Sequence, residues 1–195
     1  MEKSNLEPFI RDNLDILFIG LNPAKGSSDN RHYFSVNQAF WNQLFDSGLI
    51  TKKVDKLIAD DVVFGSNAIN FRKWDYGITD LITEVAESDS KKIKPTKEDC
   101  RRLERDIRKH QPKTTVLLHG KVTKTFLPYL GIKPVCANHG QIGKILINCP
   151  TMFYSIAFPH GNNIPSKKKV SKYNTVKHYL LKKDCHCGAG SVLLP

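Results

Sequence analysis

Short apolar runs alternate with segments of helical periodicity along the 195 residues of this chain. Each run is brief, rich in aliphatic and aromatic residues and bounded by turn-forming residues, a pattern typical of buried strands. Such strands are predicted at residues 14–20, 114–118 and 152–157. Apolar positions three and four residues apart predict helices at 38–49, 97–110, 122–130 and 167–182. Thr51 is a suitable N-cap for a further short helix at 51–58. Residues 60–83 and 132–148 contain strand-like pieces of undecided extent.

The alternation of strands and helices predicts an α/β fold. Helices on both faces of a short, mostly parallel central sheet would make a three-layer α/β/α arrangement. The length suits one domain, expected at residues 1–183, with a flexible tail at 184–195. No window approaches 18 consecutive apolar residues, so no membrane association is expected.

Charge and cysteine usage narrow the possible partners and location. Thirty Lys and Arg residues outnumber 19 Asp and Glu residues, which gives a net charge of +11. This excess makes nucleic acid the leading polyanionic partner, with a merely basic surface as the alternative. An odd number of cysteines, five, favours a reducing compartment over a disulfide framework. The mixed-charge N-terminus lacks a signal-like apolar run, so we expect an intracellular protein.

Polar, turn-forming sequence follows each of the three predicted strands. If these strands are parallel, their following loops lie at one edge of the sheet, where ligands bind in open α/β folds. Asn22, His119 and His160 would then lie near one another. The first loop has neither the GxxxxGK[ST] nor the GxGxxG spacing, so it is not a phosphate loop of either kind.

Four motifs in a fixed order resemble the mismatch-specific uracil/thymine-DNA glycosylases of the uracil-DNA glycosylase superfamily. They are GLNPA at 20–24 with Tyr33-Phe34 ahead of Phe40-Trp41, GITDL at 77–81, QP at 111–112 followed by GK at 120–121, and FPHG at 158–161. The resemblance covers roughly residues 12–182. Ala24 stands where the family has a second glycine, and Phe158 stands at a position where the family has a hydrogen-bonding residue.

The resemblance implies hydrolysis of the N-glycosidic bond of uracil in mismatched DNA, with thymine or other damaged bases as further substrates and no strand cleavage. The base must be flipped out of the duplex to reach such a site. Asn22 would hold the attacking water, since an amide can accept its hydrogen bond but is too weakly basic to deprotonate it. Pro23 restricts Asn22 to extended backbone conformations. Without the resemblance, the simpler interpretation of Asn22 is a residue that caps its own loop.

Further site residues follow from the same resemblance. Tyr33 or Phe34 would stack on the flipped base, and Asp80 would accept the imide N–H of the base or else be a plain surface or helix-capping acid. His160 would assist the departing base as the second catalytic residue, or bind a phosphate, or be an ordinary surface histidine. The expected base-binding set is Gly20, Leu21, Tyr33, Phe34, Asp80 and Phe158.

The expected DNA contacts lie in the loops and in the basic run that follows the last of them. They are Lys25, Ser27, Gly161, Asn162, Asn163, Lys167, Lys168 and Lys169. A triple lysine is otherwise a solvated face, but beside a DNA-reading loop it is suited to phosphates.

No metal or cofactor is expected, because the hydrolysis requires none and Cys185-His186-Cys187 is too short for a usual zinc or cluster site. We expect a monomer that binds duplex DNA. Two alternatives remain: a non-catalytic module that binds DNA lesions, and an α/β enzyme that processes nucleosides or nucleotides.

Overall fold

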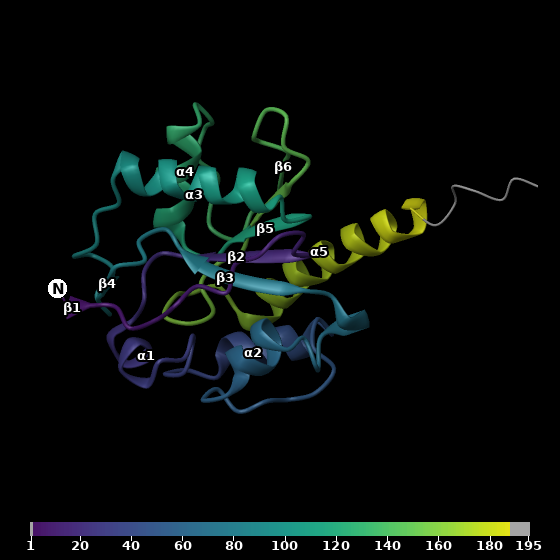
Figure 1. The fold of residues 1–195 in the computed structure, drawn as a ribbon, viewed down its shortest axis with the longest axis horizontal. Coiled ribbons are helices and arrows are strands. Elements are labelled where there is room, and N and C mark those ends of the chain that lie inside the picture. Colours follow the sequence, from purple (N-terminus) through teal and green to yellow (C-terminus); the bar gives the residue numbers. More distant parts are fainter. Residues whose placement is uncertain (1, 188–195) are drawn as a thin grey trace, which may run out of the picture.

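A five-stranded sheet forms the centre of the protein, in the order β3-β2-β5-β7-β6 (Figure 1). The structure is a computed structural model that describes residues 2–187, with side chains described through residue 184. The parallel strands are β2 (Ile16–Gly20), β3 (Tyr76–Asp80), β5 (Thr114–Leu117) and β7 (Met152–Ser155), and β6 (Gly140–Gly143) runs antiparallel to β7. The three predicted strands are confirmed, and β3 and β6 lie in the two segments that the sequence pattern left undecided.

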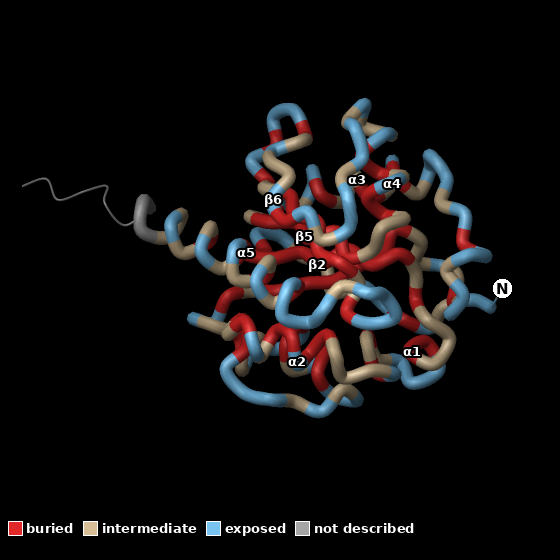
Figure 2. Tube along the Cα trace, turned by 180° about the vertical axis from the view of Figure 1, so that it is seen from behind, coloured by how far each residue is buried: buried red, intermediate tan, exposed pale blue. Residues whose placement is uncertain are grey.

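Helices cover both faces of this sheet. They are α1 (Lys25–Asn30), α2 (Ala39–Asp46) and α5 (Ser166–Cys187) on one side and α3 (Lys97–His110) and α4 (Gly120–Tyr129) on the other (Figure 1). Side chains of β2 alternate between the layers: Phe18 joins a core with α2 and α5, while Leu17 and Ile19 join a core with α3 and α4. The buried sheet between two exposed outer layers is visible in Figure 2. The predicted three-layer α/β/α fold is confirmed.

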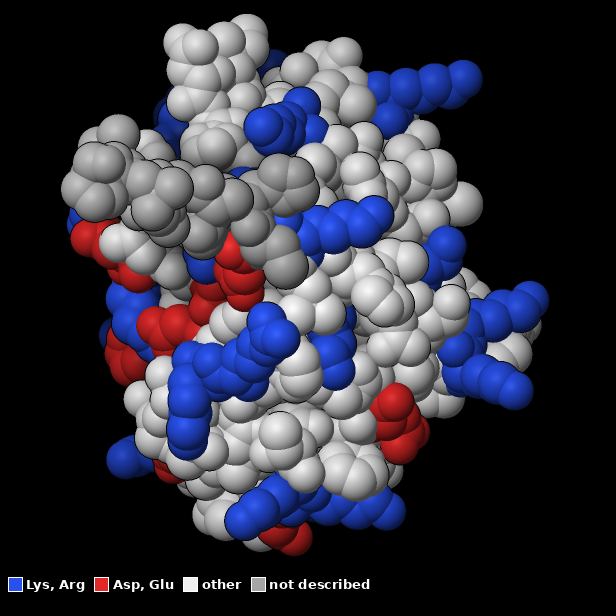
Figure 3. Space-filling model, turned by 90° about the vertical axis from the view of Figure 1, so that its right-hand side faces the viewer, with Lys and Arg blue, Asp and Glu red and all other residues white. Residues whose placement is uncertain are grey.

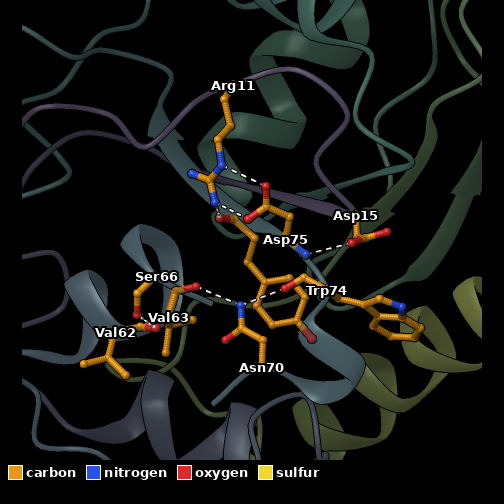
Figure 4. Close-up of polar contacts among 9 residues, drawn as sticks. Arg11, Asp15, Val62, Val63, Ser66, Asn70, Trp74 and Asp75 are labelled. Carbon is orange, nitrogen blue, oxygen red and sulfur yellow. Dashed lines mark hydrogen bonds and ion pairs between the residues drawn. The ribbon is translucent and has the colours of Figure 1, made fainter. Parts of the chain in front are cut away.

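Polar contacts fasten the amino ends of β2 and β3 together (Figure 4). Arg11 donates through Nε to Oδ2 of Asp75 at 2.8 Å, and the backbone N–H of Asp75 donates to Oδ2 of Asp15 at 2.7 Å. The side-chain amide of Asn70 donates to the carbonyls of Val63 and Trp74. This network lies at the opposite end of the two strands from Gly20 and Asp80, the register partners at their carboxyl ends.

The remaining short elements lie in the connections. They are β1 (Glu2–Lys3), which pairs antiparallel with β4 (Val85–Ala86), a π-helical turn η1 (Asp61–Gly65) and a 3₁₀ turn η2 (Phe71–Lys73). The predicted helix at 51–58 is wrong, because that segment forms turns rather than a helix. The Thr51 hydroxyl donates to the carbonyl of Ile69 at 3.0 Å, where an N-cap would have bonded its own helix.

Helix α5 continues beyond the predicted end at residue 182. Residues 184–187, which we expected to begin a flexible tail, are helical, and residues 188–195 lie outside the described residues. The side chains of the Cys185-His186-Cys187 motif are likewise outside the described part. Within that part no helix is long and apolar enough to cross a membrane. Cys100, Cys136 and Cys149 are free thiols.

Candidate active site

A cavity of about 510 Å³ opens at the carboxyl edge of the parallel sheet. The loops after β2, β5 and β7 all contribute to its wall, as does the end of β3. Asn22, His119 and His160 therefore share one site, as the strand pattern predicted. The structure also brings to this cavity all six residues of the expected base-binding set: Gly20, Leu21, Tyr33, Phe34, Asp80 and Phe158.

The side-chain amide of Asn22 is held by backbone carbonyls. Its Nδ2 donates to the carbonyl oxygens of Pro23 and Glu87, each at 2.8 Å, with that of Val85 at 3.4 Å. Its Oδ1 accepts no hydrogen bond from the described residues, although Asn22 lines the cavity. Asn22 thus caps its own loop and, by doing so, fixes which of its two polar atoms is free for a ligand.

The segment after β4 forms a part of the cavity wall that was not predicted from the sequence. Glu87, Ser88 and Ser90 line the cavity, and the backbone N–H of Glu87 donates to the carbonyl of Pro23 at 3.0 Å. Lys121, at the start of α4, holds this segment by donating from Nζ to the carbonyls of Ser90 and Ile93. The lysine of the GK motif, Lys121, therefore stabilises the backbone of the segment that forms this part of the cavity wall.

Asp80 is a buried carboxyl group at the end of β3, directly opposite Gly20 on β2. Its Oδ2 has no hydrogen-bond partner among the described residues, and burial raises its pKa to about 7, an effect that the Arg102 guanidinium opposes. Arg102 also donates to the backbone carbonyls of Asp80 and Leu81. A carboxyl with this pKa can donate or accept a hydrogen bond near neutrality. The alternative of a plain surface acid is excluded by its burial.

Two adjacent aromatic residues reach the cavity from the loop after α1. Tyr33 is buried, and its backbone N–H donates to Oδ2 of Asp60 at 2.7 Å. Phe34 has a left-handed backbone with φ of 54°. Its ring stacks on Phe40 with centroids 4.1 Å apart and lies 6.0 Å from the ring of Phe158. Phe34 and Phe158 thus form one continuous aromatic patch in the cavity wall.

Two imidazoles lie near Phe158: that of His119, the N-cap of α4 after β5, and that of His160, in the loop after β7. The ring centroids of His119 and His160 lie 5.8 and 5.0 Å from that of Phe158. The Nδ1 of His119 accepts the backbone N–H of Lys121 at 3.0 Å, so in the neutral ring the proton is on Nε2. Burial, and then the charge of Lys121, lower the pKa of His119 and keep it neutral. Partial burial, and then the charge of Lys169, lower the pKa of His160.

Comparison with known families agrees with this geometry. The family model of the uracil DNA glycosylase superfamily matches residues 7–180. The chain belongs to the uracil DNA glycosylase superfamily. Members of this superfamily are three-layer α/β/α proteins with DNA glycosylase activity on uracil, so the chain is identified as a DNA-repair hydrolase at that level. No curated protein matches the chain.

The expected DNA contacts differ in where they lie relative to the cavity. Of the expected DNA contacts, Ser27, Gly161 and Asn162 line the cavity, whereas Lys25 pairs with Glu2 at 3.0 Å. The side-chain amide of Asn162 donates to the carbonyls of Phe158 and His160, so it braces its own loop. Asn163, Lys167 and Lys168 are exposed. On the face drawn in Figure 3, Lys and Arg side chains are spread out rather than gathered in one stripe.

The prediction that Lys169 contacts phosphate is wrong for the side chain as the structure places it. Lys169 is 1% exposed, and its Nζ donates to the carbonyl of Pro159 at 3.1 Å. It lies one helical turn before the buried Tyr173, on the face of α5 that packs against the core. Lys167 and Lys168 lie off this buried stripe and are exposed, whereas Lys169 falls on it.

One group of side chains in the described part of this glycosylase has metal-ligand atoms close together. The ligand atoms of His32, Asp60 and Asp61 lie within 4.8 Å of one another. The carboxylate of Asp60 already accepts from the backbone N–H groups of Tyr33 and Asp61 and contacts Nδ1 of His32 at 2.9 Å. We therefore assign Asp60 to holding the Tyr33 segment in place.

Proposed function

We propose that this protein is a monofunctional, mismatch-directed DNA glycosylase that hydrolyses uracil, and also thymine or other damaged bases, from duplex DNA. The observation that carries the proposal is the fixed orientation of Asn22, with Nδ2 bound to backbone carbonyls and Oδ1 unoccupied at the cavity. An amide oxygen held in one place can accept a hydrogen bond from a water and keep it beneath the sugar. Fixed placement of this kind is worth several kcal/mol in favourable cases.

The reaction needs little basicity from the protein. As the N-glycosidic bond breaks, its electron pair moves to the base and the sugar approaches an oxocarbenium ion. This cation is electrophilic enough to take a neutral water, which adds to the anomeric carbon and then loses its proton to solvent or to the departing base. Asn22 is suited to hold that water without deprotonating it.

The opposite wall of the cavity is suited to the base. Phe34 and Phe158 offer aromatic faces, and stacking of this kind is worth about 1–3 kcal/mol per base. The Nε2–H of His119 is a neutral donor for a base oxygen that gains negative charge. Asp80 accepts the imide N–H when ionised and donates to a base oxygen when protonated. His160 adds a further donor at the mouth.

Mismatch preference has a simple physical basis. A base in a mismatched pair loses less pairing energy when it is flipped than a base in a Watson–Crick pair. Exposed Lys167 and Lys168 and the Gly161–Asn163 loop would hold the opened strand by its phosphates. Monomeric action on duplex DNA is part of the same proposal.

Base release from a panel of duplexes tests the proposal. The panel carries uracil, thymine, hypoxanthine or an alkylated base opposite guanine, with an undamaged duplex as control. We expect release of uracil without strand cleavage. Salt-dependent duplex binding without release would identify a lesion-binding module instead. Cleavage of free deoxyuridine without duplex affinity would identify a nucleoside-processing enzyme.

A further inference from the structure

Two buried side chains meet at one backbone carbonyl of the loop after β7. The Nζ of Lys169 on α5 lies 3.1 Å from the carbonyl oxygen of Pro159, and Nε2 of Gln43 on α2 lies 3.0 Å from the same atom. Each of the two side chains is 1% exposed. The donors come from separate helices, so this carbonyl is fixed from two directions.

The flanking carbonyls of the loop are held as well. The side-chain amide of Asn162 donates to the carbonyl of Phe158 at 2.8 Å and to that of His160 at 3.0 Å. Three consecutive carbonyls, from Phe158 to His160, are therefore each bonded by a side chain. This is the stretch that places Phe158, His160 and Gly161 in the cavity wall.

Burial of the Lys169 ammonium is a physical cost that packing alone does not explain. Removing an ammonium from water is unfavourable unless it is well paired, and an apolar side chain of similar length would fill the same space without that penalty. Burial lowers the pKa of Lys169 in accordance with this cost. The one hydrogen bond that the Lys169 ammonium makes with the described residues goes to the Pro159 carbonyl. Its role is therefore to hold the loop after β7.

The hydrogen bonds to the Pro159 carbonyl also orient the N–H of His160, because both groups belong to one planar peptide. In a trans peptide the N–H points opposite to the C=O, and the described chain contains no cis peptide bond. The N–H of His160 therefore points away from Lys169 and Gln43. It has no acceptor among the described residues. A cation at the carbonyl end polarises the peptide and strengthens that N–H as a donor.

We propose that Lys169 and Gln43 are positioning residues for base release, which fix the Pro159–His160 peptide so that the loop from Phe158 to Gly161 keeps its working shape. This inference rests on the proposed function. Lys169 acts through the loop and touches neither DNA nor base. Its role is thus different from the phosphate contact that the sequence suggested.

The same helix offers a matched control. Lys177 on α5 also donates from Nζ to a backbone carbonyl, that of Gly48 at the end of α2, at 2.8 Å. Gly48 does not line the cavity. Lys177→Met therefore removes the same kind of hydrogen bond, from a lysine of α5 to a backbone carbonyl, without touching the loop.

The experiment compares Lys169→Met, Lys169→Arg, Gln43→Leu and Lys177→Met with wild type in single-turnover release of uracil at saturating enzyme. We expect Lys169→Met to slow release by about 10- to 100-fold while duplex affinity stays within about 3-fold. Lys169→Arg, which keeps the charge and donors, should recover most of the rate, and Gln43→Leu should slow release by roughly 3- to 10-fold. Lys177→Met should release uracil at the wild-type rate.

The imidazole of His160 gives a second measurement that a merely structural role would not move. Burial and, after it, the Lys169 charge lower the pKa of His160, so Lys169→Met should raise that pKa in an NMR titration and Lys169→Arg should not. A wild-type release rate in both Lys169→Met and Gln43→Leu would overturn the inference. So would a rate loss in Lys169→Met that Lys177→Met shares or that arginine does not rescue. If Lys169→Met instead lost duplex affinity and showed a flatter salt dependence, Lys169 would be a phosphate contact and the inference would be overturned.

Failure of the proposed function would be visible separately. If wild type releases no base from any duplex, the glycosylase proposal fails, and hydrogen exchange of the free protein then tests the loop. Faster exchange at residues 160–163 in Lys169→Met than in Lys177→Met would still support the positioning role. Equal exchange in the two variants would overturn it.

Discussion

The carboxylate of Asp80 occupies the space where a side chain on Gly20 would begin. A Cβ atom at Gly20 would lie 2.0 Å from Oδ1 of Asp80, and the two residues are register partners at the ends of β2 and β3. The absence of a side chain at Gly20 lets a buried acid stand over a strand end at the cavity. The first residue of the GLNPA motif is thus explained by a residue of the GITDL motif.

Gly20→Ala should displace the Asp80 carboxylate. The added methyl has no room, so we expect a loss of stability of about 1–3 kcal/mol and slower release of uracil. Urea unfolding and single-turnover kinetics measure the two effects. Gly65→Ala is a suitable control, because its Cβ would meet Phe9 at an ordinary contact distance of 3.6 Å. An alanine at residue 20 with wild-type stability and rate would contradict this packing.

Asp80 should also make stability depend on pH in an unusual direction. Its pKa is raised from 3.8 to about 7, so between these values the folded protein keeps a proton that the unfolded chain has released. Stability should therefore fall as pH rises through this window and level off above about 7. Each unit of pKa difference corresponds to about 1.4 kcal/mol.

Asp80→Asn removes this titration and is the direct check. The variant should be more stable than wild type at about pH 8, where wild type buries a charge, and the difference should shrink towards about pH 5. Urea unfolding at both pH values measures it. Parallel stability curves for the two proteins would mean that Asp80 is already ionised well below neutrality.

Asn22 should be far more important for turnover than for binding. Asn22→Ala removes the free Oδ1 and should lower base release by at least about 10²-fold with little change in duplex affinity. Asn22→Asp should also be slow, because a carboxylate cannot donate to the carbonyls of Pro23 and Glu87 and would be repelled by them. Single-turnover release and duplex titration separate the two quantities. An aspartate variant faster than wild type would mean that a base, not a fixed amide, limits the reaction.

The sequence predicted those elements whose own residues determine them. Strand β2 is a continuous apolar run, and α3 begins at a capping box in which Thr96 and Asp99 bond one another. Strand β3 was not predicted, because Gly77 and Asp80 break its apolar pattern. Both are explained by close tertiary neighbours: a Cβ at Gly77 would lie 2.3 Å from the carbonyl oxygen of Phe9.

The candidate site was likewise predicted only in part: residues placed by the strand pattern were found, and those placed by tertiary contacts were not. Parallel strand ends bring Asn22, His119 and His160 to one edge, as the strand pattern predicted, whereas Asp80 was expected at the site only from the family resemblance. The wall at Glu87 depends on backbone pairing of β4 with β1, which leaves no mark on side-chain pattern. The burial of Lys169 depends on which face of α5 meets the core, and a run of three lysines conceals that face.

Lys167 and Lys168 should govern the salt dependence of duplex binding. Both are exposed in the first turn of α5, next to the loop that lines the cavity. Each phosphate that a lysine neutralises changes the slope of log affinity against log salt by about 0.9 in duplex DNA. Changing both to Ala should therefore flatten the slope by about 2 and weaken binding at low salt.

Single-turnover release at saturating enzyme should change little in this double variant, because neither lysine lies at the cavity. Duplex titrations over a range of salt concentrations give the slope, and Lys169→Met gives the contrast. The buried ammonium of Lys169 in wild type releases no counterions when DNA binds. The salt slope of Lys169→Met should therefore match that of wild type. An unaltered slope in the double variant would place the DNA backbone on another part of the basic surface and would remove α5 from the interface.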